Sequence, residues 1–489
     1  MKELKELLQN IAYFEIAGAE NPPIKSLQFN AGQVQPQDLF FAVIAYGIDG
    51  HQFIEEAIEN GASAIICQKI PPERKKAVVY VRVENALIAL SHIAANYYGH
   101  PTKKLKMVGV TGTNGKTSTV TLLHQIFRKL GHKTGLLSTI VNKVNDLEMP
   151  THKTTPHATE IQRLCRVMVD AGCEYCFMEL SSHGIHQKRV AGVEFAGAVF
   201  TNITHDHLDY HGSFEAYLSV KKSYLDSMGP PAFVVCNLDD PHFAEITADV
   251  TASLKSVSIK NPDADFYTKI LSNQLTGLVI ELEGKPIQLT LRAAYNAYNV
   301  LSAFTVAALL GQNKADIKKI LPELKTVEGR FDHVISKNKI IGIVDYAHTP
   351  DALDNLFSTL TSLKTHRLIS VIGCAGDRDK EKRPVMARLS YNKSDYLIIT
   401  ADNPRTEDPS QIFNDMLAGI PTDAPHLQVI PDRKEAIRYA CTIARPHDII
   451  LLAGKGHEKY QDVQGVKHPW DDKAILMTAL NIQEDAAVE

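Results

Sequence analysis

The chain has 489 residues, of which 44% are hydrophobic and 22% are charged, and its formal net charge is −4. A length of this order predicts about three globular domains. There is no basic excess of the kind that attracts nucleic acid or an anionic membrane surface, so neither is expected as a partner.

The N-terminal stretch M-K-E-L-K-E-L-L-Q-N-I has leucine or isoleucine at positions 4, 7, 8 and 11, with charges between them. This spacing predicts a short amphipathic helix rather than the apolar core of a signal peptide. No uninterrupted apolar run reaches membrane-spanning length, so we expect no membrane insertion.

Seven cysteines are scattered between Cys67 and Cys441. An odd, dispersed set argues against a disulfide framework and favours a reducing, cytoplasmic location. Cys173 and Cys176 form a lone C-x-x-C pair, for which buried structural thiols are a better interpretation than a zinc site.

The first domain is expected over residues 1–104, as a small α/β unit. It contains a predicted strand at 39–44 and a helix at 53–59 that ends near Gly61. The polar stretch H-P-T-K-K-L-K at 100–106 follows a helical segment ending near Tyr98 and predicts the first boundary.

The second domain is expected over residues 105–331, and the third over 332–489. In the second, an apolar strand at 107–110 leads through a glycine loop into a helix with apolar positions 120, 123, 126, 127 and 130 on one face. In the third, apolar runs at 340–344, 368–372, 397–400 and 449–452 are typical of a parallel sheet covered on both faces. Asp432 and Glu435 predict a capping box at a helix start.

The loop V-T-G-T-N-G-K-T-S at 110–118 predicts a phosphate site. Gly112 and Gly115 allow backbone N–H groups to face an anion, Lys116 can reach a terminal phosphate, and Thr117 offers a hydroxyl to Mg²⁺. The usual spacing G-x-x-x-x-G-K-[ST] is not met, and an ordinary turn between strand and helix is the alternative.

The run H-D-H-L-D-Y-H at 205–211 gathers five potential metal donors in seven residues. A zinc hydrolase would use the spacing H-x-H-x-D-H, and Tyr210 interrupts it here. The other interpretations are a Mg²⁺ held by phosphate oxygens and one or two protein groups, or a polar loop that holds no metal.

Seven motifs, taken in order, resemble the Mur ligases of peptidoglycan synthesis: G-T-N-G-K-T at 112–117, M-E-L-S-S-H-G at 178–184, T-N-I-T-H-D-H-L-D-Y-H-G at 201–212, D-Y-A-H-T-P-D at 345–351, G-D-R-D-K at 376–380, D-N-P-R at 402–405 and A-G-K-G-H-E at 453–458. The branch that adds the third amino acid to UDP-N-acetylmuramoyl-L-alanyl-D-glutamate is the most similar. The resemblance implies an α/β fold of three domains: a small uridine-binding domain, a central P-loop ATPase-like parallel sheet and a C-terminal Rossmann-like domain.

The resemblance also implies a mechanism. ATP phosphorylates the D-glutamate side-chain carboxylate, and the amino group of the incoming amino acid attacks the resulting acyl phosphate. Positioning and electrostatic stabilisation dominate such a phosphoryl transfer. The implied catalytic residues are Lys116, Glu179, His207 and Lys221, with two Mg²⁺ ions held by Thr117, Glu179, His207 and a CO₂-derived carbamate on Lys221. The neighbouring Lys222 is an alternative position for the carbamate.

The same resemblance assigns three sets of binding residues. For ATP they are Gly112, Thr113, Asn114, Gly115, Lys116, Thr117, Ser118, Asn299, Arg330 and Asp345. For the UDP-sugar peptide they are Thr154, Thr155, Ser181, Gln187 and Arg189. For the amino acid they are Arg378, Asp402, Asn403, Pro404, Arg405, Gly454 and Glu458. Because arginine in D-N-P-R suits a second carboxylate, the expected amino acid is meso-diaminopimelate rather than L-lysine.

Three departures from the family pattern stand out. Asn30, Ala31 and Gly32 occupy the place of an expected aspartate-serine-arginine triplet in the uridine site, and Ala293 and Ala375 replace glycines. The alternatives to this ligase are a folylpolyglutamate synthetase, a zinc hydrolase built on the histidine run, and an ATP-binding scaffold without ligase activity. The enzyme is expected to act on small molecules as a monomer.

Overall fold

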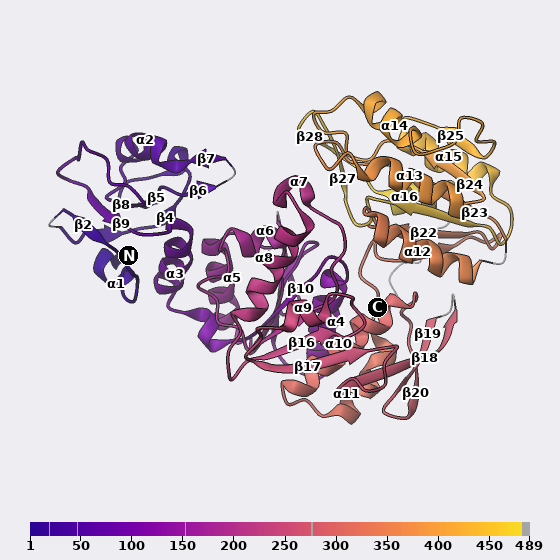
Figure 1. The fold of residues 1–489 in the computed structure, drawn as a ribbon, viewed down its shortest axis with the longest axis horizontal. Helices are drawn as coiled ribbons and strands as arrows, with labels where there is room; N and C mark the ends of the chain where they lie inside the picture. Colours follow the sequence, from indigo (N-terminus) through magenta and orange to yellow (C-terminus); the bar gives the residue numbers. More distant parts are fainter. Residues whose placement is uncertain (19, 46, 152, 275–276, 365, 482–489) are drawn as a thin grey trace.

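The computed structural model describes residues 1–481 apart from 19, 46, 152, 275, 276 and 365. It shows three lobes in chain order, each with its own β-sheet (Figure 1). The described residues form an α/β fold with three large sheets, as expected, and three two-stranded ones. The last eight residues of the predicted third domain lie outside the described part.

The N-terminal lobe is built on a five-stranded sheet with the order β2-β9-β8-β5-β4. Four strands are parallel and β2 joins β9 antiparallel at one edge. Separate hydrophobic clusters cover its two faces. The strands are β1 (Lys2–Glu3), β2 (Glu15–Ala17), β3 (Pro23–Ile24), β4 (Leu27–Gln28), β5 (Leu39–Phe41), β6 (Ile44–Ala45), β7 (Ile48–Asp49), β8 (Ala64–Cys67) and β9 (Val79–Arg82), and the helices are α1 (Leu4–Leu7), α2 (Ile54–Glu59) and α3 (Ala86–Tyr98).

The central lobe holds an eleven-stranded sheet with the order β13-β12-β11-β14-β10-β15-β16-β17-β18-β19-β20. Strands β11 to β18 of this order are parallel, with antiparallel strands at both ends. Its strands are β10 (Lys106–Thr111), β11 (Thr134–Leu137), β12 (Asn142–Val144), β13 (Leu147–Met149), β14 (Tyr175–Glu179), β15 (Gly197–Phe200), β16 (Phe233–Asn237), β17 (Ser253–Ser258), β18 (Phe266–Gln274), β19 (Gly277–Leu282) and β20 (Lys285–Gln288).

Helices cover both faces of this sheet. One cluster includes apolar side chains of α4 and α10, and the other includes those of α5 and α8. The helices are α4 (Lys116–Lys129), α5 (Ala158–Asp170), α6 (Ser182–His186), α7 (Leu208–His211), α8 (Phe214–Asp226), α9 (Phe243–Thr247), α10 (Tyr295–Leu309) and α11 (Lys314–Ile320). Since the carboxyl ends of parallel strands share one edge, the loops after β10, β14 and β15 are brought together there.

The C-terminal lobe has a six-stranded sheet with the order β21-β22-β26-β23-β24-β25, in which only β21 is antiparallel. Hydrophobic clusters again lie on both faces. Its elements are β21 (Asp332–Ile335), β22 (Ile341–Asp345), α12 (Pro350–Leu363), β23 (Leu368–Ile372), α13 (Lys382–Lys393), β24 (Tyr396–Ile399), α14 (Pro409–Leu417), β25 (Leu427–Val429), α15 (Arg433–Ile443), β26 (Ile449–Ala453), β27 (Tyr460–Val463), β28 (Val466–Pro469) and α16 (Asp472–Ala479).

Two local predictions need correction. The strand expected at 39–44 ends at Phe41, and Ile44 belongs to a separate hairpin of β6 with β7. The capping box is half formed: the Asp432 side chain accepts the Glu435 N–H at 2.9 Å, but the Glu435 carboxylate accepts from Arg438 instead. An exposed arginine three residues further along the helix provides that alternative partner.

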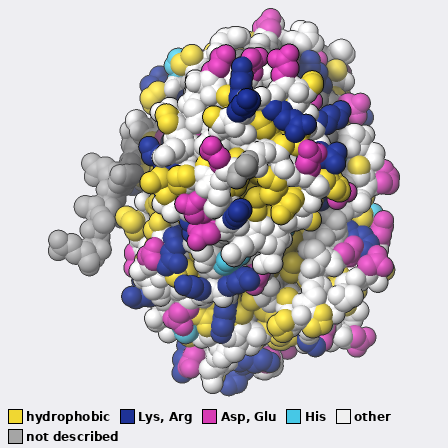
Figure 2. Space-filling model, turned by 90° about the vertical axis from the view of Figure 1, so that its left-hand side faces the viewer, with side chains coloured by type: hydrophobic (Ala, Val, Ile, Leu, Met, Phe, Trp, Pro, Cys, Tyr) yellow, Lys and Arg dark blue, Asp and Glu magenta, His cyan; other side chains and the backbone are white. Residues whose placement is uncertain are grey.

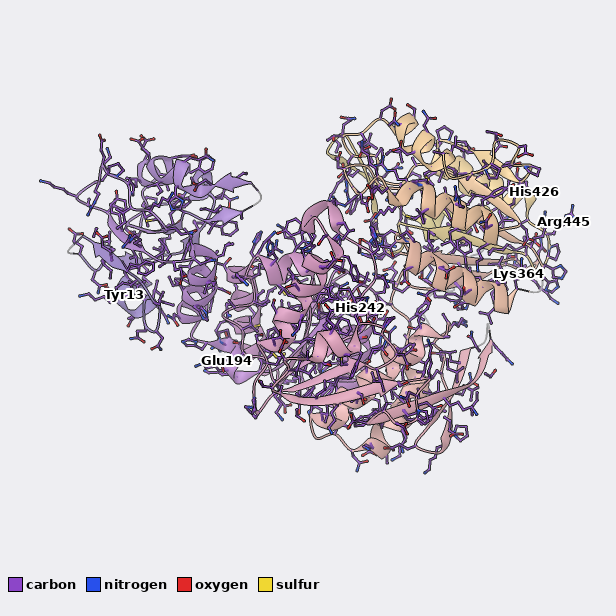
Figure 3. All side chains as sticks on the ribbon, in the orientation of Figure 1. Tyr13, Glu194, His242, Lys364, His426 and Arg445 are labelled. Carbon is purple, nitrogen blue, oxygen red and sulfur yellow. The ribbon has the colours of Figure 1, made fainter. Side chains whose placement is uncertain are left out.

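The lobes are joined by packed elements and by surface ion pairs. Helix α3 packs against α5 at the first boundary. Glu194, at the same boundary in Figure 3, pairs with Lys103 at 3.2 Å. No helix of the described residues is long and apolar enough to cross a membrane. On the face drawn in Figure 2, acidic and basic side chains are intermixed around hydrophobic ones.

Candidate active site

The glycine loop lies between β10 and α4 and turns tightly against the loop that follows β15. Gly112 has φ +144° and Gly115 has φ +87°, conformations that favour glycine. A Cβ on Gly112 would overlap the Thr201 hydroxyl. The Asn114 N–H donates to the Asn202 side chain at 2.9 Å, so the loop is fixed by β15 as well as by its own helix.

Lys116 folds back over this loop. Its ammonium donates to the carbonyls of Gly112 at 3.0 Å and Thr113 at 2.7 Å. Burial lowers the pKa of Lys116, and the nearby carboxylate of Glu179 opposes that shift. The lysine charge therefore lies directly over the loop, where a bound phosphate would be expected.

Glu179 ends β14 beside the start of α4. Its carboxylate accepts from the Thr117 hydroxyl at 2.9 Å and from the Thr139 N–H at 2.7 Å, and it is fully buried. Burial raises the pKa of this carboxyl, while Lys116 lowers it. A hydroxyl and a carboxylate at this spacing are oxygen donors of the type that Mg²⁺ prefers.

The predicted metal-donor run does not form a zinc cluster. No group of three or more histidine, cysteine, aspartate or glutamate side chains among the described residues is arranged to hold a metal ion. His205 faces Asp379 at 3.5 Å, and His211 bonds the Ser182 hydroxyl at 2.9 Å. His207 and its neighbour Asp206, 3.4 Å apart, both stay beside the glycine loop, and burial lowers the pKa of His207 to about 3.

Lys221 points into the same place from α8. Its side chain is 1% exposed, and its Nζ donates to the Gly112 carbonyl at 2.8 Å. Burial and the charge of Lys116 hold its pKa well below the ordinary lysine value. Lys222 instead forms ion pairs with Asp226 at 2.8 Å and Asp249 at 2.5 Å.

Four cavities surround this centre. The smallest, the loop cavity, has a volume of about 130 Å³ and is lined by Lys116, Thr117, Glu179, His207 and Lys221 among others. Two of the others share lining residues with it, and the third is formed by the N-terminal lobe together with residues of the central lobe.

The nucleotide cleft, about 290 Å³, lies between the central and C-terminal lobes. Six of the predicted ATP residues line it: Asn114, Gly115, Ser118, Asn299, Arg330 and Asp345. The Arg330 guanidinium lies over the Tyr346 ring at 4.5 Å, and its buried Nε has no hydrogen-bond partner in the described part of the chain. A buried N–H donor without a partner is suited to bind an anionic ligand.

The amino-acid cavity, about 240 Å³, lies at the carboxyl ends of the C-terminal strands. Its lining includes six of the seven predicted residues: Arg378, Asp402, Asn403, Arg405, Gly454 and Glu458. Pro404 is not part of this lining, and its carbonyl accepts the Glu407 N–H at 3.1 Å within the turn. Asn403 donates to Glu458 at 2.8 Å, and burial raises the pKa of that carboxyl.

The N-terminal cavity is the largest, at about 450 Å³. Asn30, Ala31 and Gly32 line it, and so do Gln187 and Arg189 from the central lobe. Arg189 is 6% exposed and donates to the Thr155 carbonyl at 2.5 Å.

The remaining predicted residues of the UDP-sugar peptide set connect this cavity to the loop cavity. Thr155 is fully buried and accepts the Ser181 N–H at 2.9 Å. Thr154 and Ser181 line the loop cavity itself. The five predicted residues therefore form a continuous path from the N-terminal lobe to the glycine loop.

His348 and Tyr346 were not among the predicted site residues, although their motif D-Y-A-H-T-P-D was identified. Both line the nucleotide cleft, the amino-acid cavity and the loop cavity. The His348 Nδ1 bonds the Tyr346 carbonyl at 2.7 Å, and burial lowers the pKa of His348 to about 4. The position of His348 within the motif D-Y-A-H-T-P-D was the sequence signal that could have found it.

Three family models match the chain in order. The model of the Mur ligase family catalytic domain matches residues 23–98, that of the Mur ligase middle domain matches 110–307, and that of the Mur ligase glutamate ligase domain matches 329–456.

Two curated relatives are similar over nearly the whole chain. The UDP-N-acetylmuramoyl-L-alanyl-D-glutamate--2,6-diaminopimelate ligase of Cytophaga hutchinsonii is 42% identical over 482 residues, covering 98% of this chain and 99% of its own. The ligase of the same name from Bacteroides fragilis is 43% identical over 477 residues, covering 97% and 98%.

Solved structures share the fold. A structure of a UDP-N-acetylmuramoyl-L-alanyl-D-glutamate--2,6-diaminopimelate ligase aligns with a TM-score of 0.69 at 29% identity, covering 98% of this chain and 99% of that one. A folylpolyglutamate synthase of Mycobacterium tuberculosis, complexed with ADP and AMPPCP, aligns with a TM-score of 0.61 at 18% identity, covering 74% and 91%.

Proposed function

The chain belongs to the Mur ligase family, and from this premise we propose that it joins meso-diaminopimelate to UDP-N-acetylmuramoyl-L-alanyl-D-glutamate with the hydrolysis of ATP to ADP and phosphate. This reaction builds the peptide of a peptidoglycan precursor. The observation that carries the proposal is that the nucleotide cleft and the amino-acid cavity both share lining residues with the cavity at the glycine loop.

Each cavity suits one substrate. The nucleotide cleft shares Asn114, Gly115 and Arg330 with the loop cavity, so a nucleotide there would have its terminal phosphate at the loop. The amino-acid cavity shares Asp206 and His207 with it. The UDP-sugar peptide would extend from the N-terminal cavity along Arg189 and Ser181 to the same point.

In the proposed reaction, an oxygen of the D-glutamate side-chain carboxylate attacks the γ-phosphorus of ATP, and ADP leaves. The amino nitrogen of diaminopimelate then attacks the carbonyl carbon, phosphate leaves with the C–O bonding electrons, and the nitrogen loses a proton. Lys116 and Arg330 would hold the phosphoryl oxygens, whose negative charge accumulates as the groups approach. The glycine loop N–H groups would orient them.

The residues present fit magnesium. Thr117 and Glu179 offer paired oxygens at the loop, and His207 offers a neutral nitrogen because its pKa lies far below the physiological range. Bound there, Mg²⁺ would offset negative charge on the phosphate oxygens. These three side chains, with Lys221 as a carbamate, are the ligands that we propose for two ions.

Lys221 rather than Lys222 is the residue that we propose for the carbamate. Attack on CO₂ requires an uncharged amine, and the burial of Lys221 favours that form. Lys222 is paired with two carboxylates, which stabilise its charge.

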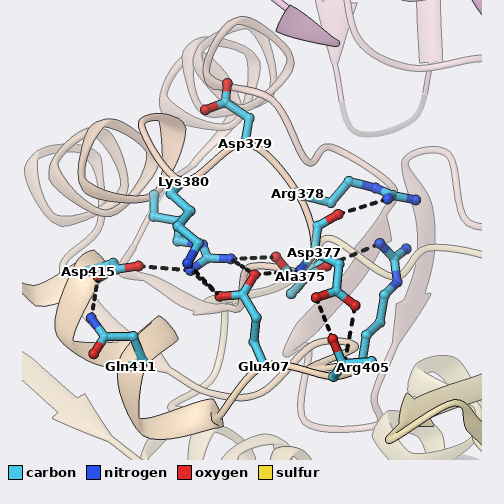
Figure 4. Close-up of polar contacts among 12 residues, drawn as sticks. Ala375, Asp377, Arg378, Asp379, Lys380, Arg405, Glu407, Gln411 and Asp415 are labelled. Atoms are coloured by element: carbon cyan, nitrogen blue, oxygen red, sulfur yellow. Dashed lines mark hydrogen bonds and ion pairs between the residues drawn. The ribbon is translucent and has the colours of Figure 1, made fainter. Parts of the chain in front are cut away.

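Specificity for diaminopimelate rests on the D-N-P-R turn. Arg405 and Arg378 both line the amino-acid cavity, and neither has a carboxylate within ion-pair distance among the described residues. Within the described residues, the Arg405 guanidinium donates only to the Gly376 carbonyl, at 3.1 Å (Figure 4). Two guanidinium groups without an acidic partner suit the distal carboxylate that diaminopimelate has and lysine lacks.

A folylpolyglutamate synthetase remains the alternative within the same fold. The synthase that aligns with this chain covers 74% of it, against 98% for the diaminopimelate ligase structure. The N-terminal lobe with its large cavity therefore favours a UDP-sugar substrate. We place the enzyme in the cytoplasm as a monomer, consistent with seven free cysteines.

The test is phosphate release by the purified protein with ATP, Mg²⁺ and the UDP-muramoyl dipeptide, with each candidate amino acid added in turn. Release that requires both the dipeptide and diaminopimelate supports the proposal. Release with a folate and glutamate, or ATP binding without any release, would contradict it.

A further inference from the structure

The helix start after G-D-R-D-K carries a lysine that differs from its neighbours. In the run K-E-K-R at 380–383, Lys380 pairs with Glu407 at 3.4 Å, and Arg383 pairs with Glu407 at 2.9 Å and Asp415 at 2.8 Å (Figure 4). Lys382 has no hydrogen bond or ion pair of its side chain within the described residues. A half-buried cation without a partner is available for an anionic ligand.

Lys382 lies at the reacting end of the amino-acid cavity. It lines this cavity, and its charge lowers the pKa of both Asp206 and His348, which places it near these two side chains. Both of them also line the loop cavity, whereas Lys382 does not. Lys382 therefore lines the amino-acid cavity beside the point where the two cavities join.

The arginines Arg378 and Arg405 lie together elsewhere on the wall. Burial lowers the pKa of Arg378, and the charge of Arg405 lowers it further. The Arg405 guanidinium donates to the Gly376 carbonyl in the turn. Carboxylates of Asp402 and Glu458 line the same cavity. The cavity thus has two separate cationic positions together with acidic groups, a pattern that matches a substrate with two carboxylates and two amino groups.

We propose that Lys382 binds the substrate carboxylate next to the reacting amino group, while Arg405 binds the distal one. This inference rests on the proposed function. By holding that carboxylate, Lys382 would fix the carbon that bears the amine and direct its nitrogen toward the loop cavity. A phosphoryl group is the less suitable ligand, because Lys116 and Arg330 already line the loop cavity and Lys382 does not.

Two variants separate the role of Lys382 from that of helix structure. Lys382→Gln removes the charge and keeps much of the side chain. Lys380→Gln is the matched control, because Lys380 lies two residues away and pairs with Glu407. In Lys382→Gln we expect KM for diaminopimelate to rise roughly tenfold to a hundredfold, the usual range for losing a charged hydrogen bond, with KM for ATP unchanged. Lys380→Gln should stay near wild type.

The decisive readout uses the two monoamides of meso-diaminopimelate, which are different compounds because the two centres have opposite configuration. Wild type should discriminate against the amide next to the reacting amine, and Lys382→Gln should discriminate against it far less. Arg405→Ala should lose its discrimination against the other amide instead. If Lys382→Gln keeps the wild-type preference, or raises KM for ATP instead, the inference is wrong. Inactivity of the wild type with diaminopimelate would contradict the proposed function itself.

Discussion

Burial controls the charge of the two lysines that face the glycine loop. Lys116 and Lys221 both donate to the Gly112 carbonyl, at 3.0 and 2.8 Å. Burial lowers the pKa of both lysines, and the charge of Lys116 lowers that of Lys221 further. Two ammonium groups in one small cavity repel each other, so conversion of one to an anionic carbamate would relieve the repulsion. The roles proposed for the two lysines are therefore complementary: one holds phosphate and the other holds metal.

For Lys116→Ala we expect ligation to fall by at least about a hundredfold, the order seen when one electrostatic stabiliser is removed. The protein should remain folded, because the hydrogen bonds of this side chain within the described part of the chain go to carbonyls of its own loop. Phosphate release gives the activity, and circular dichroism gives the fold. A folded variant with near wild-type turnover would rule out the ATP-site assignment.

For Lys221→Ala we expect almost complete loss of activity, with partial recovery when short carboxylates such as acetate are added, since a small acid could occupy the carbamate position. Lys222→Ala is the matched control and should retain activity, because its ion pairs lie on the outer side of α8. Steady-state rates with and without the added acid check this. If the defect appears in Lys222→Ala instead, the assignment to Lys221 is wrong.

At the scale of elements, a buried ion pair fixes the carboxyl end of strand β26 in the C-terminal sheet. Arg433 begins α15 and donates to Asp472 of α16 at 2.6 Å, and both side chains are at most 1% exposed. Arg433 also donates to the Ala453 carbonyl at 3.1 Å, just before the Gly454 and Glu458 positions of the amino-acid cavity. The pair thus ties two helices to the strand end that forms the cavity wall.

We expect Asp472→Ala to destabilise the C-terminal lobe by about 3–5 kcal/mol, since it leaves a buried guanidinium uncompensated. Removing the Asp432 cap by Asp432→Ala should cost about 1 kcal/mol. Burial alone would raise the pKa of Asp472, but Arg433 lowers it, so the stabilisation exists above the ordinary carboxyl pKa and is lost as the pH falls through the lowered value. Thermal denaturation should give a lower midpoint for Asp472→Ala than for Asp432→Ala. Equal midpoints would contradict this expected order.

Sequence patterns predicted elements best where the apolar pattern was strong, either on one face of a helix or along a whole strand buried on both faces. The strand, loop and helix around Lys116 and the four apolar strands of the C-terminal lobe follow this rule. The hairpin of β6 with β7 was missed because the apolar run hides the turn between residues 41 and 44. Lys382 could not be found from sequence, since only tertiary contacts show that Lys380 and Arg383 are paired and it is not.

At the scale of the whole molecule, contacts between lobes converge on the site. Asn114 of the glycine loop donates to Asp351 of the C-terminal lobe at 3.1 Å, and His205 lies 3.5 Å from Asp379. The loop that would bind phosphate therefore contacts the lobe that would bind the amino acid. The central and C-terminal lobes therefore complete this part of the site together.

Metal dependence distinguishes this account from a zinc hydrolase. We expect chelation by EDTA to abolish phosphate release and Mg²⁺ to restore it, because the donors at the loop are oxygens and one histidine. Metal analysis of the purified protein should find no tightly bound zinc. Stoichiometric zinc without ATP turnover would favour the hydrolase.

The central claim is that this is a ligase selective for diaminopimelate, and comparing kcat/KM for meso-diaminopimelate and L-lysine tests it most directly. Without the distal carboxylate, Arg405 and Arg378 would be desolvated and left without a counter-charge, a mismatch that can reach several orders of magnitude. We predict a strong preference for diaminopimelate in the wild type and its loss in Arg405→Ala with ATP binding intact. Equal values for the two amino acids, or a preference for lysine, would contradict the account.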